Sequence, residues 1–179
     1  MSKDDFKKIA LAIKTTFPNS QILQNSDAMD IWYMMLGDID YRVCQAAVLE
    51  LISISKFPPT IAEIREKCSG LTSIPIKDWG EAWESVIKAI GKYGYYETEK
   101  ALESMDELTR MCVRRIGFQN ICMSENVAAD RANFRMIYET EANRKKVNNQ
   151  LPPQLLSEKQ KMMNELIERT TKQIGLNGE

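Results

Sequence analysis

The sequence contains no histidine, and this absence removes several classes of chemistry at once. No imidazole is available as a general base near neutral pH, so Ser-His-Asp and Cys-His pairs are excluded. Histidine metal ligands are excluded for the same reason. Any catalysis would have to rest on carboxylates or lysines. Since acidic and basic residues alternate along the helical patterns, as they do on solvated surfaces, we expect the chain not to be an enzyme.

Cysteine is scarce, and the spacing of the cysteines argues against a metal-binding or redox site. The four cysteines are Cys44, Cys68, Cys112 and Cys122. No two of them have the CxxC spacing of a zinc or thiol-disulfide site, and most lie within helical patterns. We therefore expect free, buried thiols in a reducing cytoplasm.

A glycine-rich phosphate loop and long apolar runs are missing as well. Gly91-Lys92 resembles the end of such a loop, but Tyr93 follows where Ser or Thr is required. We therefore expect no nucleotide and no other cofactor. The N-terminus has no basic region followed by an apolar run, and no apolar run approaches the ~20 residues of a membrane span. These observations predict a chain without a signal peptide or a membrane segment.

What is present is the composition of an ordinary globular protein. Of the 179 residues, 44% are hydrophobic and 27% are charged, and the net charge is -1. This length allows one or two domains. With so little net charge, no overall field draws the chain to nucleic acid or to an anionic membrane. We therefore expect weak or no direct DNA binding.

Apolar residues recur with the helical period through the whole chain, and no strand pattern of any length occurs. The sequence therefore predicts an all-α protein. Small, polar and proline-containing stretches at 69–76 and 148–156 predict linkers. They divide the chain into a compact N-terminal helical domain, a second helical region and a C-terminal amphipathic helix. These three parts are expected at 1–68, 77–147 and 157–179.

Proline and capping residues mark where the predicted helices begin and end. The first helix carries an apolar stripe of Phe6, Ile9, Ala10, Ile13 and Phe17. Pro58 and Pro59 interrupt the chain, and Thr60 with Glu63 then forms a capping box that opens a helix to about Cys68. Two further capping boxes are predicted, Ser104 with Glu107 and Ser157 with Gln160.

Basic side chains gather in two short segments of the second helical region. They are Arg110, Arg114, Arg115, Arg144, Lys145 and Lys146. Such clusters can contact the phosphates of DNA. The three arginines of the first segment can equally form ion pairs with Glu103, Asp106 and Glu107, and we favour this second interpretation.

The C-terminal helix carries an apolar stripe on an otherwise charged surface. The stripe consists of Met162, Met163, Leu166, Ile167 and Ile174. Methionine-rich stripes suit adaptable partner surfaces, so these residues are candidates for partner binding. The alternative is that the helix folds back onto the body of the protein. Trp32 and Tyr33, on the second predicted helix, are further candidate partner contacts.

A family resemblance rests on three motifs in the first third of the chain. They are Phe17-Pro18-Asn19, then Asp30-Ile31-Trp32-Tyr33-Met34-Met35-Leu36 with Asp38-Ile39-Asp40-Tyr41, and finally Phe57-Pro58-Pro59-Thr60-Ile61-Ala62-Glu63-Ile64. Together these motifs resemble the N-terminal domain of the phage loader and inhibitor of replicative helicase. The resemblance covers about residues 1–68. Residues 77–147 resemble, more loosely, segments that follow this domain in other phage replication proteins.

The resemblance implies an all-α adaptor without enzymatic activity in the cytoplasm of a host bacterial cell. Such an adaptor binds the hexameric replicative helicase, holds it inactive and hands it to an origin-bound initiator. The alternative is a DNA-binding replication initiator that uses the two basic segments. An enzyme with carboxylate chemistry is a third and less favoured interpretation.

Overall fold

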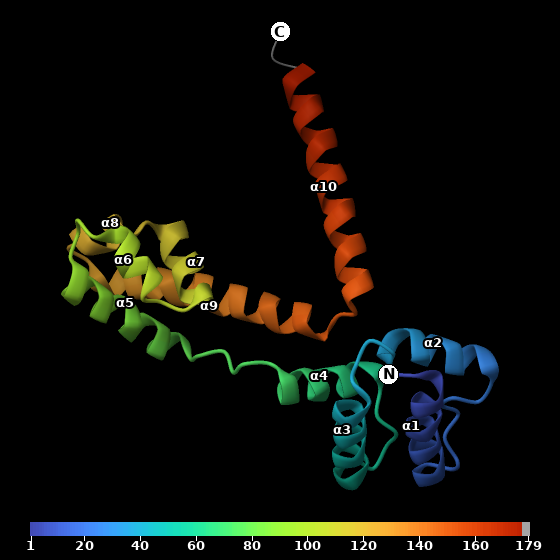
Figure 1. Cartoon of the computed structure of the whole chain (residues 1–179). Helices are drawn as coiled ribbons and strands as arrows, with labels where there is room; N and C mark the ends of the chain where they lie inside the picture. Colours follow the sequence, from blue (N-terminus) through green and yellow to red (C-terminus); the bar gives the residue numbers. More distant parts are fainter. Residues whose placement is uncertain (177–179) are drawn as a thin grey trace. The chain divides into compact units, whose positions relative to one another are not determined.

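The computed structural model describes residues 1–176, with side chains described through residue 172. Within this range the chain forms ten helices and no strand (Figure 1), so the all-α prediction is confirmed. The helices form two compact units. Unit 1 combines residues 1–73 with the segment from residue 148 onward, and unit 2 is residues 74–147.

Unit 1 begins with four helices that pack on one another. They are α1 (Lys3–Thr16), α2 (Ser26–Leu36), α3 (Tyr41–Ile54) and α4 (Ile61–Thr72). Helix α3 packs on α1 and α4, while α2 contacts α1 and α4. Each of the four starts at a side-chain cap, supplied in turn by Ser2, Asn25, Asp40 and Thr60. These caps satisfy backbone N–H groups that the first helical turn leaves without partners.

The capping box at the start of α4 has the predicted geometry. The Glu63 backbone N–H donates to the Thr60 hydroxyl at 3.2 Å, and the Thr60 backbone N–H donates to the Glu63 carboxylate at 2.7 Å. The bonds that the Thr60 backbone N–H and hydroxyl donate to the Glu63 carboxylate lower the pKa of the Glu63 carboxyl. Helix α4 continues to Thr72, however, so its last turn occupies residues predicted to begin a linker.

The core of unit 1 is built from the predicted helix faces. Four of the five stripe residues of α1 are buried, namely Phe6, Ile9, Ala10 and Ile13. Helix α3 contributes Cys44, Ala47 and Val48, and α4 contributes Ile64 and Cys68. Because the side chains of Ala10, Ala47, Cys44 and Cys68 are short, α1, α3 and α4 can pack closely together.

Unit 2 contains four complete helices and most of a fifth. They are α5 (Trp79–Tyr93), α6 (Thr98–Glu103), α7 (Glu107–Ile116), α8 (Phe118–Met123) and α9 (Val127–Gln150), whose last turn belongs to unit 1. Gly117 joins α7 to α8 with a φ of 96°, a conformation that residues with a Cβ rarely adopt. Helix α7 is capped by Asp106, whose carboxylate accepts the Thr109 N–H, and not by the predicted Ser104.

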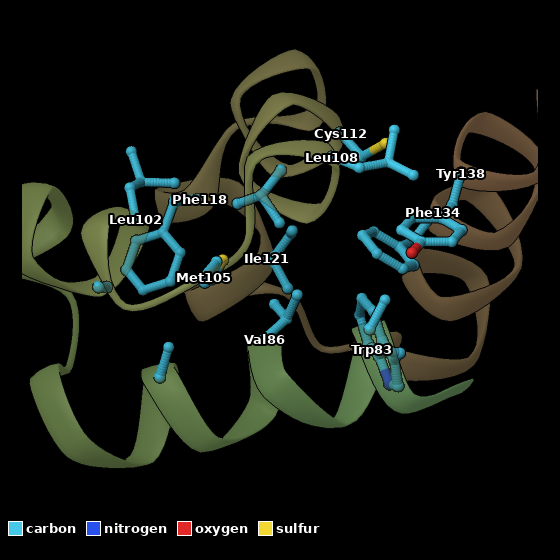
Figure 2. Close-up of a cluster of buried hydrophobic side chains, with 14 residues drawn as sticks. Trp83, Val86, Leu102, Met105, Leu108, Cys112, Phe118, Ile121, Phe134 and Tyr138 are labelled. Atoms are coloured by element: carbon cyan, nitrogen blue, oxygen red, sulfur yellow. The ribbon is translucent and has the colours of Figure 1, made fainter. Parts of the chain in front are cut away.

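Aromatic and aliphatic side chains from all five helices fill the core of unit 2 (Figure 2). Trp83 of α5 lies against Phe134 of α9, with ring centroids 5.3 Å apart, and Phe134 stacks on Tyr138 at 5.5 Å. The Tyr138 hydroxyl donates to the Lys77 carbonyl at 3.1 Å. Burial raises the pKa of Tyr138 to about 12. Helix α9 is therefore an integral part of this core.

The last helix, α10 (Pro153–Leu176), differs from all the others because none of its described side chains is buried. No described helix combines the length and the hydropathy that crossing a membrane requires. The four cysteines form no disulfide bond. Cys44, Cys68 and Cys112 are buried, and Cys122 is half-buried.

Candidate partner-binding site

Helix α10 starts earlier than predicted, at Pro153, so its first turn lies next to the N-terminal helices of unit 1. Pro153 occupies the first helical position, where its fixed φ is compatible with the helix and its missing N–H is not needed. Ser157 therefore lies inside the helix, and the predicted capping box with Gln160 does not form. Farther along, the hydroxyls of Thr170 and Thr171 donate to backbone carbonyls one turn back, at 2.9 Å.

The described part of the predicted α10 stripe is exposed to solvent. Every residue from Ser157 to Lys172 is exposed. Met162, Met163, Leu166 and Ile167 keep between 51% and 64% of their surface in contact with solvent, and Leu155 keeps 40%. The side chain of Ile174, also predicted to belong to the stripe, lies outside the described side chains. Four large apolar side chains on one helix are thus each more than half exposed.

The root of α10, residues 150–156, is held to the N-terminal helices of unit 1 by a buried arginine. Arg65 of α4 is 6% exposed, and its guanidinium donates two bonds to the Asp38 carboxylate, at 2.7 and 2.8 Å. The same side chain donates to the backbone carbonyls of Met35 and Gln150. Gln150 is the last residue of α9, so one side chain joins the α2–α3 turn to the start of the C-terminal segment.

Apolar packing adds to this attachment. Pro152 is buried, and Leu151 and Leu156 are half-buried. Leu151 and Leu156 line a pocket whose other wall includes Val43 of α3 and Cys68 of α4. Residues 148–156, predicted as a linker, are therefore held against the N-terminal helices by specific contacts.

The buried arginine was missed by sequence reasoning, although the sequence contains a signal for it. Ile61, Ile64, Arg65 and Cys68 follow the i, i+3, i+4, i+7 spacing of one helix face. Arg65 thus occupies a core-facing position, and a buried cation requires a buried or half-buried partner. That partner, Asp38, lies 27 residues away in the chain.

A groove runs between α2 and the start of α10. Its lining comes from three parts of unit 1: Lys3, Asp30, Tyr33, Met34, Gly37, Asp38, Pro152, Pro153 and Gln154. Tyr33, a predicted partner contact, borders this groove. Its hydroxyl donates to the Met1 carbonyl at 3.2 Å, and its ring lies 5.6 Å from that of Phe6. Tyr33 therefore has a structural role and also lies at an accessible surface.

Trp32, the other candidate on α2, is placed differently. Its side chain belongs to the core of unit 1 and is only 9% exposed. This burial leaves little of the indole for a partner, because α2 turns Trp32 and Leu36 toward α1 and α4. The outer face of α2 instead carries Ile31 and Met34, which are 54% and 62% exposed. Met34 lines the groove, and Ile31 adds exposed apolar surface on the same helix.

The two basic segments meet in unit 2 through a buried acid. Glu141 of α9 is 8% exposed and pairs with Arg115 of α7 at 3.1 Å and with Arg144 at 3.3 Å. Glu141 thus fixes two guanidinium groups that are distant in sequence. Neither basic segment, 110–115 or 144–146, indicates by itself that Glu141 is its ion-pair partner.

The remaining basic residues show that ion pairing occurs, but with partners other than those predicted. Arg114 pairs with Glu99 at 3.7 Å, and Lys145 pairs with Glu107 at 3.7 Å. Arg110 is half-buried and Lys146 is exposed on the surface of α9. These pairs offset part of the positive charge that the DNA-binding interpretation requires.

Of the acids predicted to pair with the arginines, Asp106 pairs with Lys77 instead, at 3.2 Å. Burial opposes ionisation of Asp106, but bonds from Thr109 and Lys77 outweigh it and lower its pKa. Asp106 is thus an ionised helix cap and not a partner of the basic segments.

Comparison with known proteins bears on the N-terminal part of the chain. Residues 1–65 match the family model for the N-terminal domain of the phage helicase loader/inhibitor gp39P. This is the family that the N-terminal motifs resemble, so the resemblance is confirmed for residues 1–65. No curated protein and no solved structure matches the chain. The matched residues form α1, α2, α3 and the first part of α4, up to Arg65.

Proposed function

We propose that this chain is a phage DNA-replication adaptor that binds the hexameric replicative helicase through α10 and holds it inactive. It then delivers the helicase to an origin-bound initiator in the cytoplasm of the host bacterium. One observation carries the proposal. The domain that matches the loader family and a helix with an uncovered apolar stripe belong to the same compact unit.

Burial of the stripe supplies the binding free energy in this proposal. Removing apolar surface from water is favourable by about 25 cal/mol per Å², so four large side chains can contribute several kcal/mol. Methionine and leucine adapt to the shape of an apolar groove, and an amphipathic helix in a groove is a recurrent mode of peptide recognition. Because α10 is already helical, less conformational entropy is lost on binding.

In this proposal, Arg65 sets the position of α10 on the N-terminal domain. By joining Asp38 and the Gln150 carbonyl, it fixes the start of α10 on the N-terminal domain. A helicase subunit that binds α10 would then also meet the groove at Tyr33 and Met34. We propose that the chain works without hydrolysing ATP, by stabilising one conformation of the helicase ring. Purified chain alone should therefore leave ATP intact.

The direct test introduces charge into the stripe. Leu166→Asp combined with Ile167→Asp should weaken helicase binding at least tenfold, because burying unpaired carboxylates is unfavourable. A matched control adds the same two charges to the polar face of α10, by Ser157→Asp with Asn164→Asp. Helicase affinity is measured by titration, and unfolding is measured in parallel.

Two results would contradict the proposal. Equal helicase affinity of the stripe variant and the control would place the contact elsewhere on the chain. A collapse of the melting temperature in the stripe variant alone would show that the stripe is part of the folded core.

A further inference from the structure

Unit 2 carries a surface groove that neither its core nor the proposed helicase contact uses. The groove lies between the first turn of α5 and the first half of α9. Its lining is Trp79, Val127, Ala128, Arg131, Ala132 and Arg135. Apart from the two guanidinium groups, this lining consists of aliphatic and aromatic carbon.

The core buries one tryptophan of α5 almost completely and the other only in part. Trp83 is buried against Phe134 (Figure 2), whereas Trp79, one turn earlier, is half-buried at the edge of the cluster. On α9, the small residues Ala128 and Ala132 are both exposed. They leave an open apolar floor beside the indole of Trp79.

Two arginines are held in place over this indole. The guanidinium carbons of Arg131 and Arg135 lie 5.1 and 4.8 Å from the Trp79 ring centroid, within the range of cation–π attraction. The Nε of Arg135 donates to Glu139 at 2.9 Å, which leaves its two terminal nitrogens available. Among the described residues, no carboxylate pairs with Arg131. The groove is thus bordered by two guanidinium groups, positioned over the indole, whose terminal nitrogens have no protein acceptor in the described part of the chain.

We propose that this groove binds an acidic peptide segment of a partner protein that carries one bulky apolar side chain. The apolar side chain would lie on Ala128 and Ala132 against Trp79, and flanking carboxylates would accept hydrogen bonds from Arg131 and Arg135. Guanidinium groups bind carboxylates in a bidentate geometry, and tryptophan and arginine are among the residues most enriched at the energetic centres of interfaces. This site is independent of the helicase contact on α10.

The charges and the lining favour a peptide over a single-stranded nucleic acid. The groove offers no polar group other than the two arginines to contact a base edge. Residues 74–147 carry equal numbers of basic and acidic side chains, so unit 2 has no overall attraction for a polyanion. A short acidic segment needs only the local pair of arginines.

The test measures binding of a defined peptide to the full-length chain by fluorescence anisotropy. The probe is a fluorescein-labelled octapeptide with a central Leu-Phe pair flanked on both sides by Asp and Glu. One control peptide replaces the acids with Asn and Gln, and another replaces Leu-Phe with two alanines. Each control should bind at least tenfold more weakly, because each removes one half of the recognition.

Protein variants then locate the site. Arg131→Glu, which reverses the charge, and Ala132→Glu, which places a carboxylate on the floor, should each weaken binding at least tenfold. Both positions are exposed, and circular dichroism with a melting curve verifies the fold. Arg114→Glu makes the same charge change elsewhere in unit 2 and should leave the affinity unchanged.

Three results would overturn the proposal. They are no binding of the probe at millimolar concentration, equal binding by the Arg131→Glu and Arg114→Glu variants, or tighter binding of an oligothymidylate than of the peptide with the same Arg131 dependence. The last result would assign the groove to nucleic acid.

Discussion

Helices α9 and α10 have the same length, 24 residues, but they have opposite relations to the rest of the protein. Helix α9 buries Phe134, Tyr138 and Glu141, and each of them has a defined partner. Helix α10 has the more continuous apolar stripe, yet its side chains from Ser157 to Lys172 are all exposed. An apolar stripe therefore predicts a helix but does not predict that the same chain covers it.

The difference lies in what the two stripes are made of. The buried residues of α9 are mainly aromatic rings that contact Trp83 and one another in fixed geometries, which specify a single arrangement. The stripe of α10 consists of methionine, leucine and isoleucine, which pack against many shapes. By this comparison, the side chains of α9 stabilise the fold of unit 2, whereas the stripe of α10 has a composition that suits contact with a partner protein.

The largest expected effect comes from removing one of the aromatic rings. Phe134→Ala should lower the free energy of unfolding by about 3–5 kcal/mol, because it leaves a cavity beside Trp83 and Tyr138. Leu166→Ala on α10 should change it by less than about 0.5 kcal/mol, as for other exposed positions. Urea denaturation of both variants measures the contrast. Similar losses in the two variants would remove the distinction between the helices.

The next largest effect concerns the root of α10. Arg65→Ala should lower the free energy of unfolding by about 3 kcal/mol, because it leaves Asp38 and the Gln150 carbonyl without their donor. Arg42→Ala, an exposed arginine of α3, is the matched control and should be nearly neutral. Urea denaturation again gives the comparison. An Arg65 variant as stable as the control would show that this attachment contributes nothing.

A smaller effect is expected at the start of α4. Thr60→Ala should cost about 0.5–2 kcal/mol at neutral pH, because it removes the helix cap. The Thr60 hydroxyl also donates to the Glu63 carboxylate, and the folded state lowers the pKa of Glu63 below its unfolded value. The stabilisation from this bond is therefore present above about pH 4.3 and is lost as pH falls through the folded pKa. The difference between Thr60→Ala and wild type should therefore shrink at about pH 3. A difference that stays constant with pH would exclude a stabilising bond between the Thr60 hydroxyl and the ionised Glu63 carboxylate.

Local patterns in the sequence predicted the helices and one of the three proposed capping boxes, because the groups involved are only three or four residues apart. The α1 stripe and the Thr60–Glu63 box are examples. Contacts between distant residues were not predictable in the same way. Arg65 meets Asp38 across 27 residues and Gln150 across 85.

The candidate site shows the same division. The apolar stripe of α10 was predicted, since its period is local, whereas its exposure was left open by the sequence. The attachment of its root, the burial of Trp32 and the role of Glu141 in joining the two basic segments depend on tertiary packing. A sequence pattern shows that a helix face is apolar, whereas only the three-dimensional arrangement shows which face is already covered.

Amide hydrogen exchange in α10, with and without the helicase hexamer, tests the central claim most directly. A helical segment whose side chains are all exposed opens readily, so we expect exchange over residues 157–172 of the free chain to be faster than exchange in α9 around Phe134. Adding helicase should slow exchange over residues 157–172 at least tenfold and leave the core of unit 2 unchanged. Unchanged exchange in α10 on a chain that demonstrably binds the helicase would contradict the account.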